Sequence, residues 1–490
     1  MSIVAYDFGA SGGRALLGRL NGGKIEVEEL HRFPNDPVRV GDRLHWDILR
    51  LYHEVKQGLL KAKRAGETPE SVGIDSWAVD FGLIGRHGEL LANPYHYRDP
   101  HTDGMMEKVF ARLSRESVFA KTGIQFLQFN TIYQLAALKE ADSPLMREGR
   151  RFLMIPDLLR YFLTGEAANE FTNATSTQLF NPLLGGWDPE LLALVGAPAE
   201  WFGPPLAPGS PAGELLPSVR AELGLPRIPV VATAEHDTGA AVAAIPATDR
   251  AFAYLICGTW SLMGTEVERP VMNDAALAYN FTNEGGVGGT YRLLKNIMGL
   301  WILQECKREW DRSGTEYSYA ELVRLAERAP AFASFIDPDD ARFLPPGDMP
   351  ERIRAYCRET GQPVPDGPGE TARCILESLA LKYRYILELT ERLSGHKFGG
   401  LHMSGGGIQN TLLCQWTANA IRKPVWAGPA EGSAIGNLVV QWMAQGAFRD
   451  IWEARRAVRD SIAIDVYDPT DASAWEDAYG RFVPLAGLNG

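Results

Sequence analysis

The chain has 490 residues, with 49 basic and 61 acidic side chains and a formal net charge of −12 at pH 7. This charge argues against a nucleic-acid or anionic-membrane partner, and no apolar run approaches the roughly 20 residues that span a membrane. With 45% hydrophobic and 22% charged residues, the chain has the composition of a globular protein large enough for two domains. No basic signal peptide precedes the first apolar run, so we expect a cytoplasmic protein.

The first element with chemical meaning is a hairpin predicted over residues 3–17, where strand-forming residues flank a turn of small residues. Because the side chains of this turn are small or absent, its backbone N–H groups can approach an anion closely. A phosphate is therefore expected at the turn residues Ala10, Ser11, Gly12, Gly13 and Arg14. Asp7, just before the turn, could hold a hydrated cation against that phosphate. A plain glycine-rich hairpin is the alternative for this turn taken alone.

The next stretch combines a predicted helix over residues 47–65 with a strand-like run over residues 73–81. Strand alternation would place Trp77 and Val79 on one face and Ala78 and Asp80 on the other. We expect Trp77 to be a core residue, because that is the common position of an aromatic side chain in such a run.

Near the middle of the chain an acid follows a predicted buried strand. Residues 228–232 form an apolar run, and the small residues at 239–244 predict a tightly packed helix, with Asp237 between them. Asp237 could be a catalytic base, or only an N-cap that accepts hydrogen bonds from the first helical N–H groups. His236 and Thr238 flank it and could bind substrate hydroxyls, although a structural histidine is the alternative for His236.

A second hairpin of the same design is predicted over residues 251–264, about half a chain after the first. The repeat indicates two similar halves, each placing a glycine turn at a shared cleft. Two such turns suit a nucleoside triphosphate, and Thr259 is expected to contact its terminal phosphate. Residues 401–410 then run from a strand through three glycines into a helix. Gly405 and Gly406 offer bare backbone for an adenosine, although a tight turn is the alternative.

Other residues of the second half carry weaker signals. Asn296 could donate its amide to substrate hydroxyls or cap a helix, and Gln304 could reach the nucleotide.

An acidic cluster, formed by Asp337, Asp339 and Asp340, lies among prolines that favour a solvated turn over a metal site. The five cysteines match no zinc pattern and are expected to be reduced, but Cys357 and Cys374 flank a turn and could pair if oxidised. Residues 370–393 and 474–482 are predicted helices, the last packing back on a domain.

These stretches, in this order and spacing, resemble the FGGY carbohydrate kinases of the actin, hexokinase and Hsp70 superfamily, and within them the rhamnulokinases. The similarity runs almost from end to end and includes residues 31–33, 73–81, 97–99, 123–126, 173–179, 282–286 and 294–301. It implies an α/β fold with two ribonuclease-H-like domains, 1–244 and 245–490, around a central cleft. One departure concerns the first turn, where relatives carry two adjacent serines but Gly12 follows Ser11 here, so a hydroxyl contact to phosphate could be missing.

The resemblance also implies an activity. It predicts an ATP- and Mg²⁺-dependent kinase that acts on the 1-hydroxyl of L-rhamnulose, working as a monomer or small homo-oligomer. Another ketose kinase, of the fuculose or xylulose type, is the near alternative, and a non-catalytic actin- or Hsp70-like nucleotide switch is the distant one. The resemblance supports Asp237 as the base and implies a sugar contact at the Ala78 backbone. Asp80, His236, Thr238 and Asn296 are further candidates for binding the sugar, and Asp7 is the candidate metal residue, acting through water.

Overall fold

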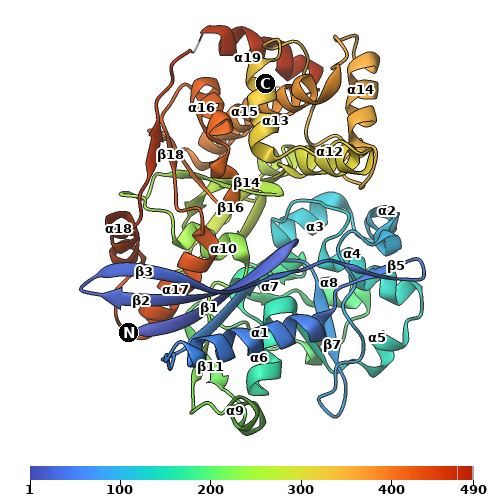
Figure 1. Cartoon of the computed structure of the whole chain (residues 1–490). Coiled ribbons are helices and arrows are strands. Elements are labelled where there is room, and N and C mark those ends of the chain that lie inside the picture. The colour runs from blue at the N-terminus through green and yellow to red at the C-terminus, as the bar shows by residue number, and fades with distance from the viewer. Residues whose placement is uncertain (472, 488–490) are drawn as a thin grey trace. The chain divides into compact units, whose positions relative to one another are not determined.

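The structure is a computed structural model and describes residues 1–471 and 473–487 (Figure 1). These residues form two compact units, each assembled from separate parts of the sequence. The first unit comprises Met1–Thr248, Glu266–Leu293 and Gly432–Ile462, and the second comprises Asp249–Thr265, Leu294–Glu431 and the described part of Ala463–Gly490. The units therefore differ from the predicted halves in two segments, 266–293 and 432–462, which rejoin the first unit.

A six-stranded sheet supports the first unit, in the order β11, β12, β6, β1, β2, β3. These strands are β1 (Ser2–Gly9), β2 (Gly12–Asn21), β3 (Lys24–Pro34), β6 (Val72–Ser76), β11 (Ser210–Glu214) and β12 (Pro229–Ala232). β1 and β2 are antiparallel, which confirms the first predicted hairpin, whereas β6 runs parallel to both β1 and β12. The carboxyl ends of β1, β6 and β12 therefore share one edge of the sheet.

The second unit repeats this arrangement. Its strands are neighbours in the order β16 (Tyr291–Met298), β14 (Trp260–Val267), β13 (Ala253–Cys257), β17 (Leu401–Ser404), β18 (Val425–Ala427) and β19 (Asp465–Tyr467). β13 and β14 form the second predicted hairpin, while β17 runs parallel to β13 and β18 parallel to β17. In both sheets the first hairpin strand thus has its antiparallel partner on one side and a parallel strand on the other, which confirms two similar α/β halves.

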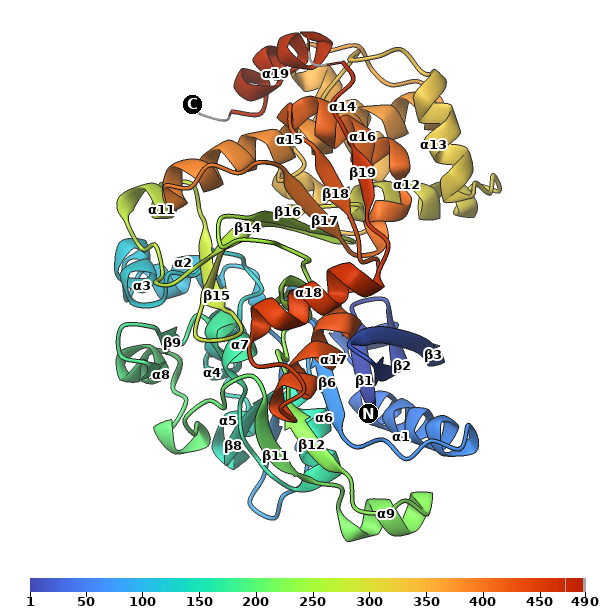
Figure 2. The ribbon, with the colours of Figure 1, turned by 90° about the vertical axis from the view of Figure 1, so that its left-hand side faces the viewer.

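A late helix completes the first unit. α17 (Gly432–Ala444) packs against α10 (Asp237–Ala243) and against β1 and β6. The two helices approach so closely that a Cβ on Gly436 would lie 1.7 Å from the Ala240 carbonyl oxygen, which only glycine permits. α17 contacts β1 and β2, and α18 (Ile451–Ser461) contacts β3, the next strand of the sheet (Figure 2). Residues 432–462 belong to the first unit because their apolar faces are buried there.

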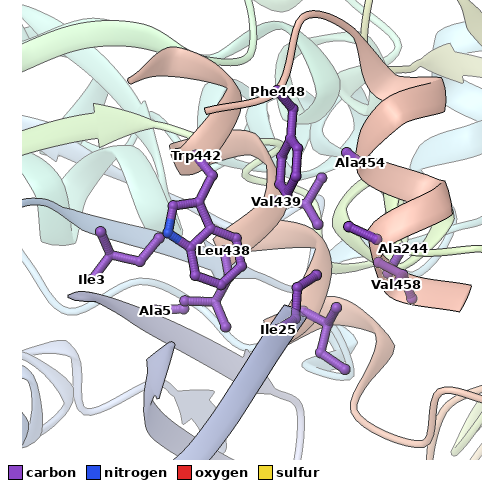
Figure 3. Packing of buried hydrophobic residues seen from close by; sticks show 12 residues of the cluster. Ile3, Ala5, Ile25, Ala244, Leu438, Val439, Trp442, Phe448, Ala454 and Val458 are labelled. Atoms are coloured by element: carbon purple, nitrogen blue, oxygen red, sulfur yellow. The ribbon is translucent and has the colours of Figure 1, made fainter. Parts of the chain in front are cut away.

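Side chains from both ends of the chain build this part of the core. Ile3 and Ala5 of β1 lie in one buried cluster with Leu438 and Trp442 of α17 (Figure 3). Trp442 is fully buried, as is Val458 of α18. Burying side chains of this size contributes about 1.5–3 kcal/mol each, so these contacts anchor α17 on the sheet.

The remaining elements of the first unit surround its sheet. The predicted helix at 47–65 is confirmed as α1 (Ile48–Arg64), capped by Asp47, which accepts a hydrogen bond from the Arg50 N–H (3.2 Å). The other helices are α2 (Met105–Phe110), α3 (Arg115–Thr122), α4 (Thr131–Glu140), α5 (Pro144–Glu148), α6 (Ile155–Thr164), α7 (Phe171–Ala174), α8 (Pro189–Val195), α9 (Pro217–Leu223) and α11 (Asp274–Ala278). Short strands are β4 (Val38–Val40), β5 (Arg43–His45), β7 (Phe81–Ile84), β8 (Arg151–Met154), β9 (Phe180–Asn181), β10 (Gly186–Trp187) and β15 (Thr282–Gly285).

Helices of the second unit include both that were predicted. They are α12 (Trp301–Arg312), α13 (Tyr319–Arg328), α14 (Met349–Glu359), α15 (Gly367–Ser394), α16 (Thr411–Ile421) and α19 (Ser473–Leu485). α19 packs against α15 and α16, where Glu476 forms an ion pair with Arg384 (2.9 Å), so the predicted terminal helix packs back as expected. Across residues 1–471 and 473–487, no helix is both long and apolar enough to cross a membrane.

Candidate active site

Three loops of the first unit follow strands that end at the same edge of its sheet. Asp7, near the end of β1, is paired in register with Asp75 of β6. The N–H of Ser76, the last residue of β6, donates to the Glu235 carbonyl oxygen (2.9 Å), and Ser76 forms a bridge with His236. The loop that leads to Asp237 therefore lies directly beside the end of β6.

Asp237 is the first residue of α10, and the cap position belongs to His236. The Nδ1 atom of His236 accepts a hydrogen bond from the Thr238 N–H (3.1 Å). Asp237 Oδ1 accepts from the same N–H (2.6 Å) and from the Thr238 hydroxyl (3.3 Å). His236 therefore takes the cap position, while Asp237 also accepts a first-turn N–H, so its role as catalytic base stays a prediction.

Asp237 belongs to a group of three carboxylates. Burial raises the pKa of Asp75 well above its usual value, and the nearby Asp7 and Asp237 carboxylates raise it further, while Asn437 Nδ2 donates to Asp75 Oδ2 (2.6 Å). Burial also raises the pKa of Asp7, against the opposing attraction of Arg14, whose Nη2 lies 2.9 Å from Asp7 Oδ2. The side chain of Asp237 is 29% exposed and that of Asp7 only 7%, so Asp237 is the carboxylate most accessible to a substrate.

These carboxylates fit a hydrated cation better than a directly bound one. Asp75 Oδ1 is buried and makes no hydrogen bond with any described residue. In the part of the chain that the structure describes, no group of three or more His, Cys, Asp or Glu side chains is arranged to hold a metal ion. Mg²⁺ that accompanies nucleotide phosphates usually keeps several waters, and Asp7 acting through water stays a prediction. Sequence reasoning missed Asp75, whose link to Asp7 is the pairing of β1 with β6.

His236 is held on its other side by a buried ion pair. Its Nε2 lies 3.3 Å from Glu284 Oε2, and Arg292 Nη2 lies 3.1 Å from the same oxygen. Its Nδ1 accepts from the Thr238 N–H and also lies 3.0 Å from Asp237 Oδ1, so each ring nitrogen faces a protein group. A substrate hydroxyl would therefore share a nitrogen that already has a protein partner. Glu284 was also missed, since no sequence spacing connects it to His236.

The loop before Asp237 is fixed from the protein interior. Arg160 is fully buried, and its Nε donates to Glu235 Oε1 (2.7 Å). Glu170 Oε2 accepts from the Glu235 N–H (3.2 Å) and from the Thr172 hydroxyl (2.6 Å), whose oxygen accepts from the His236 N–H (3.1 Å). Burial raises the pKa of Glu170 to about 7. These buried hydrogen bonds and ion pairs make a rigid support for the residues that follow.

The strand predicted through residues 77–80 is wrong. β6 ends at Ser76 and β7 begins at Phe81, and Val79 between them has a φ of 68°. The Asp80 N–H donates to the Ala78 carbonyl oxygen (2.9 Å), so the chain turns here and strand alternation does not apply. Trp77 is buried, as predicted, whereas Ala78 and Val79 are half-buried.

The carboxylate of Asp80 stabilises this turn through buried hydrogen bonds. This fully buried group accepts hydrogen bonds from Trp46 Nε1 (2.6 Å), Trp77 Nε1 (3.0 Å), the Tyr97 N–H (3.2 Å) and Gln134 Nε2 (2.8 Å). Burial raises the pKa of Asp80 to about 7, while these donated hydrogen bonds lower it. Because both oxygens already have protein donors, Asp80 supports the turn, and its direct sugar contact stays a prediction.

The predicted phosphate turn of the first unit joins β1 to β2. Ser11 is exposed, while Ala10, Gly12 and Arg14 are half-buried. A Cβ on Gly13 would lie 2.3 Å from the ring of Phe33, so packing alone requires glycine at this position. Phosphate binding at the other turn residues remains a prediction.

In the second unit, two predicted nucleotide residues are brought together. The Thr259 hydroxyl, in the β13–β14 turn, donates to Gln304 Oε1 of α12 (3.3 Å). In the triple glycine, a Cβ on Gly405 would lie 2.8 Å from the Cys257 carbonyl oxygen, but one on Gly406 would meet no atom of the described residues within 4 Å. Gly406 thus offers open backbone. Asn296 lies within β16, so its alternative role as a helix cap is wrong.

The acidic cluster of this unit differs from the solvated turn that was predicted. Lys382 Nζ lies 2.9 Å from Asp337 Oδ1 and 3.0 Å from Asp339 Oδ2. Although burial lowers the pKa of Lys382, the two carboxylates raise it overall, so an ammonium group occupies the place where a cation would bind. The five cysteines are buried and free, so pairing of Cys357 with Cys374 on oxidation stays a prediction.

Known proteins are similar to this chain over nearly its whole length. The model for the FGGY family of carbohydrate kinases, N-terminal domain, matches residues 2–244, and that for the C-terminal domain matches residues 253–445. The chain is 48% identical to a rhamnulokinase of Bacteroides thetaiotaomicron over 481 residues (98% of both chains), and 41% identical to one of Bacillus subtilis over 471 residues (96% of both). In fold it is similar to gluconate kinase from Lactobacillus acidophilus (TM-score 0.82, 17% identity, 99% of this chain and 97% of that one). It is also similar to Plasmodium falciparum glycerol kinase with ADP (TM-score 0.77, 15% identity, 100% and 99%).

Proposed function

Because the chain belongs to the FGGY family of carbohydrate kinases, we propose that it transfers the γ-phosphoryl group of ATP to the 1-hydroxyl of L-rhamnulose, giving L-rhamnulose 1-phosphate. Membership of this family makes the chain a sugar kinase, a phosphotransferase with an alcohol group as acceptor. The observation that carries the choice of sugar is the similarity to rhamnulokinases over nearly the whole chain.

Asp237 is our candidate for the general base. Phosphoryl transfer asks the protein mainly for positioning, charge stabilisation and a group that accepts the proton of the attacking hydroxyl. The sugar O1 would form its bond to the γ-phosphorus as the bond to the bridging oxygen breaks, its proton passing to Asp237 while ADP departs with the bridging oxygen. The exposed position of Asp237 and the two hydrogen bonds from Thr238 support this role.

Sugar binding would use the residues around this base. The turn at Ala78 offers half-buried backbone beside the strand end that pairs with His236. The Thr238 hydroxyl and the ring of His236 supply polar groups for the sugar hydroxyls. Asp80 would act chiefly by holding the turn, and Asn296 remains a proposed contact.

The nucleotide would be bound by residues described separately in each unit. The candidates are Ala10, Ser11, Gly12, Gly13 and Arg14 in the first unit and Thr259, Gln304, Gly405 and Gly406 in the second. Mg²⁺, when bound, would neutralise charge on the phosphates. Asp7, acting through water, is the candidate residue for it.

We further propose that the enzyme works in the cytoplasm as a monomer or small homo-oligomer. Five buried, unpaired cysteines suit a reducing compartment, where disulfides are rare.

A sugar panel tests the proposed function. ADP release would be measured with L-rhamnulose, L-fuculose and D-xylulose, and the product identified by ³¹P NMR. We expect sugar-dependent release that is fastest with L-rhamnulose and yields a 1-phosphate. Slow ATP hydrolysis that is indifferent to sugar would instead indicate a nucleotide switch.

A further inference from the structure

The turn between β6 and β7 holds a valine in a conformation that valine rarely adopts. Val79 has a φ of 68°, and the hydrogen bond from the Asp80 N–H to the Ala78 carbonyl (2.9 Å) closes a γ-turn around it. A γ-turn with positive φ is rare and strained, and a β-branched residue is especially unfavourable there. Glycine would take this conformation without that penalty. The strain therefore points to a use for the valine side chain itself.

The surrounding side chains hold Val79 in place. The Thr131 hydroxyl donates to the Val79 carbonyl oxygen (2.7 Å), as does Gln134 Nε2 (3.3 Å). Gln134 also donates to Asp80, so buried polar groups hold the carboxyl side of the strained residue. Strained residues persist where their surroundings over-determine them, and they cluster at functional sites.

Val79 also lies at the edge of the sheet where the candidate site residues are found. It follows the carboxyl end of β6, where Ser76 pairs with His236, one residue before the candidate base Asp237. In this turn Trp77 and Asp80 are buried, whereas Ala78 and Val79 are half-buried. The turn therefore leaves Val79 only half-buried, beside the residues that would bind the sugar.

We propose that Val79 is a specificity-determining residue, whose isopropyl group contacts the C6 methyl of a 6-deoxy ketose. This inference rests on the proposed function, since it names the part of the site that would distinguish the C6 methyl group of the sugar from a hydroxymethyl group. A hydroxyl placed against this apolar group would lose its water without gaining a partner. The neighbouring carboxylate of Asp80 is no substitute, because both its oxygens already accept protein hydrogen bonds.

The test compares two sugars that differ only at C6. L-rhamnulose is 6-deoxy-L-fructose, so the readout is the ratio of kcat/KM for L-rhamnulose to that for L-fructose in wild type, Val79→Gly, Val79→Ala and Val79→Ile. We expect this ratio to fall about 10-fold or more in Val79→Gly, the size of effect that one apolar contact supplies. Val79→Ala should lie between glycine and wild type, and Val79→Ile should keep the preference.

Stability separates this role from a structural one. Val79→Gly should melt no lower than wild type, because glycine relieves the strain. Val40→Gly, at a site 63% exposed in β4, is the matched control and should keep the wild-type ratio. If wild type phosphorylates L-rhamnulose but Val79→Gly and Val79→Ala keep its ratio, this inference is overturned and the proposed function stands. A wild-type protein with no ketose kinase activity would overturn both.

Discussion

Replacing Arg160 with leucine should strongly destabilise the first unit at neutral pH. The buried guanidinium lies 2.7 Å from Glu235 Oε1 and 2.9 Å from Asp157 Oδ1, and it also donates to the Ala168 carbonyl oxygen (2.7 Å). Leucine replaces none of these donors and leaves two buried carboxylates without their cation. Removing one partner of a buried ion pair typically costs about 3–5 kcal/mol, so we expect a loss of that size in the free energy of unfolding.

This loss should shrink as the pH falls. Burial raises the pKa of Glu235 well above its usual value, and Arg160 is the main group that lowers it. Without Arg160 the pKa rises further, so the folded variant can neutralise the carboxyl group by binding a proton. A carboxyl whose pKa is raised on folding contributes stability that is present at low pH and lost as the pH rises through the folded value. The deficit should therefore be larger at pH 8 than at pH 5.

Urea unfolding at these two pH values measures both effects. Arg147→Leu is the matched control, because Arg147 pairs with Asp142 at the surface, with side chains 56% and 92% exposed. Such exposed pairs contribute less than about 1 kcal/mol. Turnover of Arg160→Leu should fall as well, since Glu235 lies two residues before Asp237. Unfolding midpoints that match those of the control at both pH values would refute the reasoning.

Three further predictions follow from the same structure. Replacing Gly406 with valine should raise the apparent KM for ATP and leave sugar binding nearly normal. A Cβ there meets no atom of the described residues, so the variant should fold, and its side chain would stand where the adenosine is proposed to bind. An unchanged KM would indicate that the triple glycine is only a turn. Replacing Glu284 with leucine should lower kcat/KM about 10-fold or more, because it removes the carboxylate 3.3 Å from His236 Nε2 and leaves the buried guanidinium of Arg292 without that carboxylate. Glutamine at position 284 should lower it less, because it keeps the size and polarity of the side chain, and equal losses in the two variants would contradict this role. The wild-type unfolding midpoint should fall as the pH rises from about 5 to about 7, because the folded chain keeps a proton on Glu170 that the unfolded chain releases. Glu170→Gln should flatten that part of the urea profile, and an unchanged slope would argue against it.

The hairpins and main helices could be predicted because their signals are local. Small residues mark the turn between β1 and β2, and Asp47 caps an amphipathic run that forms α1. The strand at 229–232 and the helix that starts at Asp237 follow from an apolar run and a stretch of small residues. Each of these features depends on neighbours in the sequence, so a single chain reveals them.

Other features depend on partners far along the chain. The local pattern at residues 77–80 predicts a strand, because two of the four donors that hold Asp80 come from Trp46 and Gln134, which no local pattern connects to it. Asp75 joins the acidic group only through the pairing of β1 with β6, and Glu284 reaches His236 only through the fold. The residues of the site could thus be listed in part, but not their contacts.

Turnover of Asp237→Asn tests the central claim most directly. The asparagine carbonyl can still accept the hydrogen bonds that Asp237 Oδ1 receives from Thr238, whereas an amide cannot accept the proton of the sugar hydroxyl. Thermal unfolding should therefore match wild type, while kcat with L-rhamnulose falls roughly 100-fold or more, the usual effect of losing a general base. A variant that melts normally and keeps most of its turnover would contradict the assignment of Asp237 as the base.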